Sequence, residues 1–253
     1  MVRLDANSPS ISEELTDDSH LSDRLLPTNL YSDEPPLETD FHRNQIDLLI
    51  RLLKYWWQDR TDFYISGNLT VYYNQQQLKK RDFRGPDVFV VLGAEKRDRR
   101  SWTIWEEGGK YPNVVIELLS NSTASIDKGT KKDLYQEIWR VPDYFWFHPE
   151  TLEFAGFHLV DGRYAAISPT EMGWLWSEQL ELYLGIYEQQ LRWFTVEGQL
   201  IPLPEEQERQ AKEQAQQAEA QERQAKEQAQ QQAEHLEALL RSQGIDPDQL
   251  PDL

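Results

Sequence analysis

The order of apolar and polar positions predicts short strands and a few helices between residues 40 and 201. Two apolar, β-branched runs are decisive, Gly85–Val91 and Asn113–Ser120, because each is short and is bounded by glycine, proline or asparagine. Runs of this kind are typical of buried strands. Each run carries one acid, Asp87 or Glu117, and a buried carboxylate is costly unless it is paired or holds a cation.

The same patterns predict the remaining elements of an α/β fold. Apolar residues at helical spacing predict a helix over 41–58, capped by Thr39 or Asp40, and a second helix over 125–140. Aromatic and alternating runs predict a hairpin over 62–73 that turns at Gly67-Asn68, a strand over 144–147, a hairpin over 152–167 and short strands over 174–201. Residues 74–84 are expected to form a polar linker.

Composition divides the chain into four parts. Residues 1–36 are acidic and polar, which predicts a largely disordered arm, and residues 37–203 form the globular domain. Residues 204–243 are rich in Gln, Glu and Ala, and Glu208–Ala215 recurs two heptads later as Glu222–Ala229. This repeat predicts a long exposed helix. It either forms a coiled coil or stands alone, because an alanine seam buries little area. Residues 244–253 form a tail.

Charge, cysteine content and hydropathy narrow the classes of function. The formal net charge of −18 at pH 7 argues against non-specific coating of nucleic acid. Residues 79–100 are basic nevertheless, so they either receive phosphates or form an ordinary solvated loop. The absence of cysteine favours a reducing cytoplasm and excludes a thiolate metal site, and no segment has the apolar length of a membrane span.

Asp87 and Glu117 are the candidate metal ligands. On neighbouring strands their carboxylates could meet around one divalent cation, and hard oxygen ligands favour Mg²⁺ or Mn²⁺. The backbone carbonyl of Leu118 could complete the protein ligands. Lys131, on the following helix, would supply the positive group that phosphodiester hydrolysis needs. The simpler alternative is that Glu117 and Lys131 form a structural salt bridge.

These residues resemble the motifs of a known family. The resemblance is to the PD-(D/E)XK nuclease superfamily, and more specifically to the bacterial Uma-two family of putative restriction endonucleases. It rests on Pro86-Asp87, Val115–Ser120, Asp127–Lys131, Tyr135 and Val141–Tyr144, and it covers residues 36–195. It implies a restriction-endonuclease-like core, in which helices flank a mixed β-sheet, and metal-dependent cleavage of DNA.

The resemblance also assigns roles to particular positions. The first acid of the superfamily maps onto Asp87 and the second onto Glu117. The lysine of the superfamily stands two residues after the second acid, where this chain has Leu119, so the lysine maps instead onto Lys131 of the following helix. Some members use a further acid from the first helix, for which Glu38 is the nearest candidate.

Other conspicuous residues have simpler interpretations. Packing is expected for Tyr135, and a core or capping role is expected for His42. A solvated loop is expected to hold Glu106 and Glu107, because Gly108-Gly109 follows them. The histidines show no metal-ligand spacing, so no zinc site is expected.

The sequence therefore predicts a Mg²⁺-dependent DNA endonuclease with an Asp–Glu–Lys site. The alternative is a catalytically silent protein of the same fold that binds partners through its C-terminal helix. The acidic balance favours this alternative, and the intact Asp–Glu–Lys set opposes it. A homodimer could form through the nuclease domain or through that helix. A small-molecule hydrolase is a third option, but no recognisable nucleophile supports it.

Overall fold

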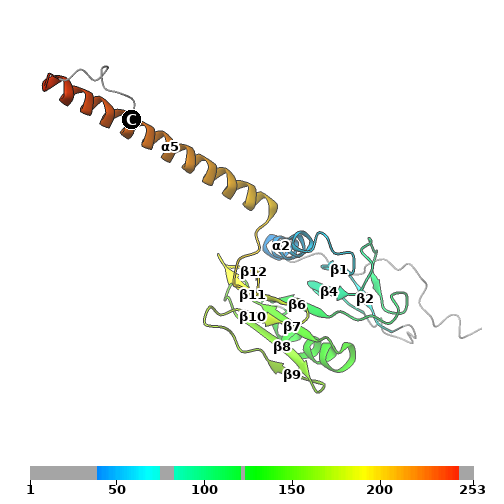
Figure 1. Cartoon of the computed structure of the whole chain (residues 1–253). Coiled ribbons are helices and arrows are strands. Elements are labelled where there is room, and N and C mark those ends of the chain that lie inside the picture. Colours follow the sequence, from blue (N-terminus) through cyan, green and yellow to red (C-terminus); the bar gives the residue numbers. More distant parts are fainter. Residues whose placement is uncertain (1–38, 75–82, 121–122, 245–253) are drawn as a thin grey trace, which may run out of the picture. The chain divides into compact units, whose positions relative to one another are not determined.

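The computed structural model describes residues 39–74, 83–120 and 123–244 (Figure 1). The acidic arm predicted over residues 1–36, the candidate ligand Glu38 and nearly all of the predicted tail lie outside the described residues. By its internal contacts the chain divides into two units, Met1–Ile201 and Pro202–Leu253. The first unit contains the sheets and the shorter helices, and the second contains one long helix.

A six-stranded mixed sheet forms the centre of the first unit. Its strands, in order across the sheet, are β1 (Phe63–Ser66), β4 (Val88–Leu92), β6 (Val114–Leu118), β7 (Asp143–Phe147), β8 (Phe154–Val160) and β9 (Arg163–Ala166). β6 and β7 are parallel and are joined by a helical crossover, whereas the other neighbouring pairs in this sheet are antiparallel. The predicted α/β class with a mixed sheet is confirmed.

Two three-stranded sheets complete the first unit. Their strands are β3 (Phe83–Arg84), β2 (Val71–Tyr72) and β5 (Trp102–Thr103) in one sheet, and β10 (Leu175–Ser177), β11 (Leu182–Tyr187) and β12 (Gln190–Phe194) in the other. The strands predicted over 174–201 and the hairpin predicted over 152–167 are confirmed. In that hairpin β8 turns into β9 at Asp161 and Gly162, whose φ angles of 48° and 82° suit a type I′ turn.

The hairpin predicted over residues 62–73 is wrong. β1 pairs with β4 of the large sheet, whereas β2 pairs with β3 and β5. Gly67 lies between two sheets, where Ile46 and the backbone of Asp87 leave no room for a Cβ atom. β3 likewise occupies the end of the linker predicted over 74–84. A two-stranded hairpin is only marginally stable alone, so pairing within larger sheets overrides the local turn signal.

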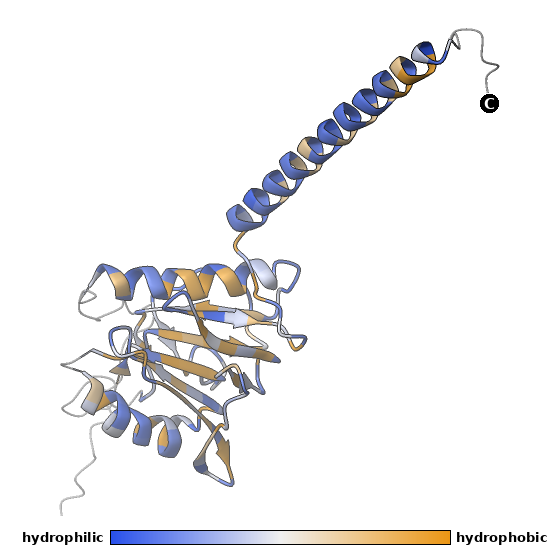
Figure 2. Ribbon diagram, turned by 90° about the vertical axis from the view of Figure 1, so that its left-hand side faces the viewer, coloured by the Kyte–Doolittle hydropathy of each residue, from blue (hydrophilic) through white to orange (hydrophobic). Residues whose placement is uncertain are grey.

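Helix α2 (Asp40–Trp56) packs against β1, β4 and β12. Thr39 caps its N-terminus by accepting the His42 N–H at 3.2 Å. The observed bounds lie within two residues of the helix predicted over 41–58. Figure 2 shows apolar positions recurring along α2 and dominating the central strands. The buried residues of α2 include Ile46, Leu49, Leu52 and Leu53.

One helical run with two loosened turns connects β6 to β7. α3 (Ala124–Ile126) and α4 (Lys132–Leu134) alternate with the π-helical turns η1 (Asp127–Lys131) and η2 (Tyr135–Trp139). This run confirms the helix predicted over 125–140, and it ends at Arg140, whose φ of 52° is left-handed. Its buried side packs on one face of the sheet, in a cluster that includes Phe89, Val115, Leu134, Tyr135, Trp139 and Tyr144.

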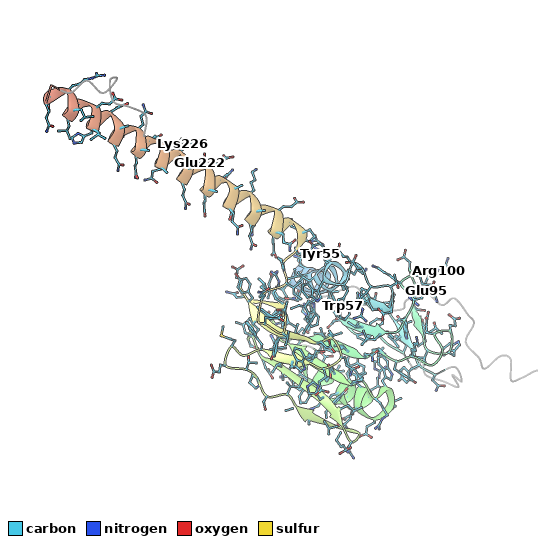
Figure 3. The ribbon with its side chains drawn as sticks, viewed as in Figure 1. Tyr55, Trp57, Glu95, Arg100, Glu222 and Lys226 are labelled. Carbon is cyan, nitrogen blue, oxygen red and sulfur yellow. The ribbon has the colours of Figure 1, made fainter. Side chains whose placement is uncertain are left out.

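α5 (Pro204–Ser242) is the helix of the second unit. Proline stands at its first helical position, and the Glu206 side chain accepts the Leu203 N–H at 2.8 Å. None of its residues is buried, which confirms a long exposed helix, while the coiled coil stays a prediction. Ion pairs four residues apart, such as Glu222 with Lys226 at 2.7 Å, support it (Figure 3). Within the described residues, no helix combines the length and apolar character needed to cross a bilayer.

Candidate active site

Strand pairing brings Asp87 and Glu117 into contact. β4 and β6 are antiparallel, with Val88 opposite Ile116, so Asp87 at the start of β4 lies beside Glu117 near the end of β6. Asp87 Oδ2 accepts the Leu118 N–H at 2.7 Å, and the Asp87 N–H lies 3.4 Å from Glu117 Oε2. The two acids that the sequence predicts on neighbouring strands therefore meet at one edge of this strand pair.

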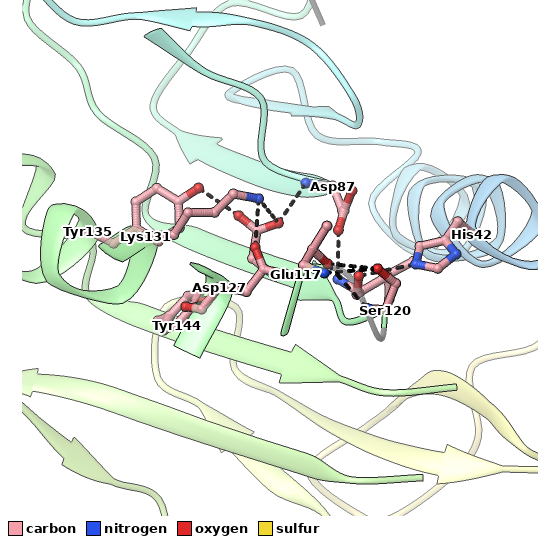
Figure 4. Close-up of polar contacts among 10 residues, drawn as sticks. His42, Asp87, Glu117, Ser120, Asp127, Lys131, Tyr135 and Tyr144 are labelled. Carbon is pink, nitrogen blue, oxygen red and sulfur yellow. Dashed lines mark hydrogen bonds and ion pairs between the residues drawn. The ribbon is translucent and has the colours of Figure 1, made fainter. Parts of the chain in front are cut away.

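The Glu117 side chain is fully buried and is held at both oxygens (Figure 4). Oε1 accepts the Tyr135 hydroxyl at 2.6 Å, and Oε2 accepts a hydrogen bond from Lys131 Nζ at 3.0 Å. Both donors come from the helical run that covers this face of the sheet, because Glu117 shares a face of β6 with Val115. The salt bridge between Glu117 and Lys131 is thus present. It leaves room for a cation, since a carboxylate has about four acceptor positions.

Lys131 lies between two buried acids. Its Nζ is 3.0 Å from Glu117 Oε2 and 2.8 Å from Asp127 Oδ1. Asp127, Lys131 and Tyr135 recur every four residues, and in a regular α-helix such positions drift by about 40° per step. The π-helical turns wind more loosely and bring the three side chains into line. The Lys131 side chain is 19% exposed, so solvent reaches the site.

Leu118 is held through both of its backbone groups. Its N–H donates to Asp87, and its carbonyl oxygen lies 3.2 Å from His42 Nε2 on α2. His42 Nδ1 is 2.8 Å from Thr39 Oγ1, whose hydroxyl can donate to it while accepting the His42 backbone N–H. These partners assign the ring proton to Nε2, which donates to the carbonyl. A carbonyl oxygen has two lone pairs, so this bond is compatible with a cation at Leu118.

The turn after β6 determines where the helical run begins. Ser120 Oγ accepts the Thr123 N–H at 3.2 Å, and Thr123 Oγ1 accepts the Ser120 N–H at 3.2 Å. This exchange is similar to a capping box, in which two side chains satisfy two backbone donors. It starts the helix directly after the Glu117 strand, and the first turns then return Asp127 and Lys131 to Glu117.

The site contains more acid than base. Asp87, Glu117 and Asp127 surround the ammonium of Lys131, so two negative charges are in excess when all four groups are ionised. Burial raises the pKa of Glu117 to about 8 and that of Asp87 to about 6, although Lys131 opposes both shifts. Burial alone would lower the pKa of Lys131, but attraction to the three acids raises it overall. Lys131 therefore keeps its proton at neutral pH.

The donor set fits the hard divalent cation that the family resemblance implies. Mg²⁺ takes oxygen ligands and is often held by one or two carboxylates, with waters and substrate phosphates in the remaining positions. Asp87, Glu117 and the Leu118 carbonyl offer such oxygens, and the excess negative charge matches one divalent ion. Among the described residues, no group of three or more His, Cys, Asp or Glu side chains could hold a metal ion, so a cation here would depend on two carboxylates, one carbonyl and water.

The turn after β5 holds Glu106 and Glu107, and only Glu106 is exposed as expected. Glu107 is not solvated, because its side chain is only 12% exposed and accepts bonds from Arg97 at 2.7 Å and Arg99 at 2.6 Å. These arginines belong to the basic run predicted over 79–100, and they follow the end of β4 opposite to Asp87. This pairing engages both arginines with Glu107, and residues 79–82 of the basic run lie outside the described residues.

Three further residues belong to the site by contact, although the sequence analysis gave none of them a role in it. Asp127 shares the four-residue repeat of Lys131 and Tyr135, and this repeat is the signal that could have revealed it. Tyr135 packs as expected, yet its hydroxyl also bonds Glu117, and burial together with that acid raises the pKa of Tyr135 well above its ordinary value. His42 is a buried histidine of the capped turn, but it also touches Leu118, which no local pattern reveals.

The chain is similar to one protein family over most of its length. The family Uma2, described as "Putative restriction endonuclease", matches residues 28–197. No curated protein matches the chain. Among solved structures, it is similar to "a putative nuclease belonging to DUF820" from Anabaena variabilis ATCC 29413. The two share 12% sequence identity over 57% of this chain and 76% of that chain, with a TM-score of 0.42. Because the family match spans more than half of the chain, the chain belongs to the Uma2 (Uma-two) family of putative restriction endonucleases.

Proposed function

We propose that the protein is a divalent-metal-dependent endonuclease that hydrolyses DNA phosphodiester bonds at Asp87, Glu117 and Lys131. The observation that carries the proposal is that two strand acids and a lysine lie together in a member of a nuclease family. Glu117 Oε2 is 3.0 Å from Lys131 Nζ and 3.4 Å from the Asp87 backbone nitrogen. Family membership supports nuclease activity in general. The metal, the DNA substrate and the role of each residue are the finer parts of the proposal.

Asp87, Glu117 and the Leu118 carbonyl would hold Mg²⁺ or Mn²⁺. When bound, the cation would neutralise charge on the scissile phosphate and lower the pKa of a water molecule. Both carboxylates must lose their protons to bind it, so cation and protons compete for the same oxygens. Asp87 Oδ2 also accepts the Leu118 N–H. The proposed ligand Asp87 therefore holds the residue whose carbonyl is the third proposed ligand.

Lys131 would act as a cation rather than as a base. Its raised pKa keeps the ammonium protonated at neutral pH. It would donate a hydrogen bond to the attacking water or to a phosphate oxygen, and its charge would stabilise the pentavalent phosphate. Asp127, 2.8 Å from the ammonium, keeps Lys131 beside Glu117.

DNA is the substrate class that family membership favours. The net charge of −18 repels phosphates from the protein as a whole, so attraction must be local, through the bound cation and Lys131. A cytoplasmic location is part of the same proposal, because a chain without cysteine suits a reducing compartment.

Cleavage by the full-length chain tests the proposal. Supercoiled plasmid and labelled single-stranded DNA are incubated with Mg²⁺, with Mn²⁺ or with EDTA. We expect cleavage only with metal, and a rate loss of at least about a hundredfold for Asp87→Asn, Glu117→Gln and Lys131→Met. Asp133→Asn changes an exposed acid on the same helical run and should cut like wild type. Equal rates for Glu117→Gln and wild type would disprove the assigned site.

A catalytically silent scaffold is the second candidate, and α5 favours it. This helix of 39 residues has no buried residue, and its Leu236 and Leu239 are 58% and 46% exposed. An exposed helix with a heptad-spaced seam suits binding of a partner or of a second copy. A scaffold would neither cut DNA nor be stabilised by divalent metal, whereas the nuclease should do both. Sedimentation of the full-length chain over a range of concentrations would show whether copies associate.

A further inference from the structure

Tyr135 carries a hydroxyl that packing does not require. Its ring is fully buried, with ring centroids 4.9 Å from Trp139 and 5.3 Å from Tyr144. A phenylalanine would fill the same space, and a buried hydroxyl costs free energy unless it is hydrogen-bonded. The partner of this hydroxyl is Glu117 Oε1 at 2.6 Å, which belongs to a proposed metal ligand.

The hydrogen bond from Tyr135 helps to determine the orientation of the Glu117 carboxylate. The terminal torsion of a glutamate is broad, so a carboxylate held at one oxygen can rotate. Tyr135 holds Oε1, while Oε2 faces Lys131 Nζ at 3.0 Å and the Asp87 N–H at 3.4 Å (Figure 4). Without the Tyr135 hydroxyl, Oε1 would lose this donor. The Glu117 carboxylate would then be held mainly at Oε2 and could rotate.

Tyr135 is itself held in place. Trp139 and Tyr144 pack against its ring, and its backbone carbonyl accepts the Val141 N–H at 2.9 Å. Tyr135 directly follows α4 and faces β6 together with Lys131, because both side chains donate hydrogen bonds to Glu117. A rigid donor of this kind can impose a single orientation on the acid that it contacts.

We infer that Tyr135 is a positioning residue, which orients the Glu117 carboxylate so that Oε2 faces Asp87 for binding of a divalent cation. Groups that orient metal ligands contribute about ten- to a hundredfold to metal affinity or activity. The inference rests on the proposed function, because Tyr135 has this role only if Glu117 holds a cation.

Calorimetric titration of the full-length chain with Mn²⁺, without DNA, tests the inference. Tyr135→Phe removes only the hydroxyl. The matched control is Tyr144→Phe, which removes an equally buried hydroxyl whose acceptor is the backbone carbonyl of Asp127 at 2.9 Å. We expect Tyr135→Phe to weaken Mn²⁺ binding by about tenfold or more, and Tyr144→Phe to stay within about twofold of wild type.

A second readout separates orientation of the ligand from loss of stability. In the DNA cleavage assay, the Mg²⁺ concentration for half-maximal rate should rise about tenfold in Tyr135→Phe. At saturating Mg²⁺ the rate should return to within about threefold of wild type, because the cation then occupies the site despite its weaker affinity. Simple destabilisation would reduce the rate without moving the Mg²⁺ midpoint.

The outcomes distinguish the inference from the proposed function. Weaker Mn²⁺ binding in Tyr135→Phe alone, with rescue at high Mg²⁺, supports the inference. Unchanged affinity in Tyr135→Phe, or equal losses in both tyrosine variants, overturns the inference while the proposed function stands. If neither wild type nor Glu117→Gln binds Mn²⁺ and neither cuts DNA, the proposed function fails and the inference fails with it.

Discussion

Glu107 and Glu117 show how the same side chain serves structure in one region and a candidate site in another. Both are largely removed from solvent, at 12% and 0% exposed, and both accept hydrogen bonds from cationic side chains. Two arginines bond Glu107, whereas Glu117 shares one lysine with a second acid. The balance of charge therefore distinguishes the compensated carboxylate of Glu107 from the candidate cation site at Glu117.

The pairing of Glu107 is a structural clamp on the loop after β4. Arg99 donates to both carboxylate oxygens at 2.6 and 2.9 Å, and its guanidinium lies 4.6 Å from the Tyr64 ring centroid and 4.7 Å from that of Trp102. Burial alone would raise the pKa of Glu107, but the hydrogen bond and charge of Arg99 and the charge of Arg97 lower it overall. A carboxylate compensated in this way needs no further cation.

The surroundings of Glu117 shift its pKa in the opposite direction. Burial, and the charges of Asp87 and Asp127, raise its pKa to about 8 although Lys131 opposes the shift. An excess of buried negative charge lowers stability, and such strained electrostatics is a property of functional sites more often than of structural ones. An excess of this kind would favour binding of protons or, under the proposed function, of a divalent cation.

The largest effect should come from making the same substitution in both regions. Glu107→Gln leaves Arg99, which is 2% exposed, without its carboxylate, and should lower the metal-free free energy of unfolding by about 3 kcal/mol. Glu117→Gln removes one acid from the excess while Asp127 still pairs with Lys131. Its free energy of unfolding should stay within about 1 kcal/mol of wild type or rise. Urea unfolding at pH 8 measures both, and equal losses would contradict the contrast between the two regions.

Divalent metal and pH should act mainly on the Glu117 region. At a hundred times its Kd, Mg²⁺ should add about 2.7 kcal/mol to the free energy of unfolding at pH 8. The folded-state pKa values of Glu117 and Asp87 are raised to about 8 and about 6, so their protonated forms favour folding at low pH. This contribution is lost as pH rises through those values. Metal-free stability should therefore fall over this range, while the gain from Mg²⁺ should grow.

Thermal unfolding of wild type and Glu117→Ala from pH 5 to pH 9, with and without Mg²⁺, measures this prediction. Glu117→Ala should show a flatter pH profile and no gain from Mg²⁺. Because the pKa of Glu107 is lowered, its contribution to stability is present above the ordinary value of 4.5 and is lost only on acidification. Glu107→Gln should therefore retain the stabilisation by Mg²⁺. A gain from Mg²⁺ that survives in Glu117→Ala would place the cation elsewhere.

The smallest effect should come from the outer arginine of the Glu107 clamp. Arg97 is 48% exposed and shares the carboxylate with Arg99. Exposed ion pairs contribute about 0.2–1 kcal/mol, so Arg97→Ala should lower the free energy of unfolding by less than about 1 kcal/mol. A double-mutant cycle of Arg97→Ala with Glu107→Gln measures the coupling directly. Coupling above about 2 kcal/mol would contradict the minor contribution expected of Arg97.

Elements with strong local signals were predictable from the sequence. The helix α2, the strands β4, β6 and β7, and the β8–β9 hairpin follow from apolar spacing and turn residues. The hairpin predicted over 62–73 was wrong. Its turn signal at Gly67-Asn68 is local, whereas β1 pairs with β4, whose residues lie 23 to 29 positions further along the chain. Pairing partners far apart in the chain are decided by how whole sheets assemble.

The candidate site divides in the same way. Asp87, Glu117 and Lys131 could be singled out because each has a strand or helix context and matches a family motif, and the structure brings them into contact. The contact of His42 with Leu118 could not be foreseen, because it depends on how α2 docks on the sheet. Tyr135 could be assigned to the second helix and to packing, but the acceptor of its hydroxyl was not identifiable.

The sequence by itself determined the family, the order of the two acids and the lysine, and the long exposed helix. These properties depend on residue identity and on short-range spacing, which strands and helices preserve. Only the tertiary structure decided which carboxylates are compensated, because burial and charge balance depend on distances between segments remote in the chain. In the sequence Glu107 and Glu117 are two acids ten residues apart, and the fold gives one of them two arginines and the other a shared lysine.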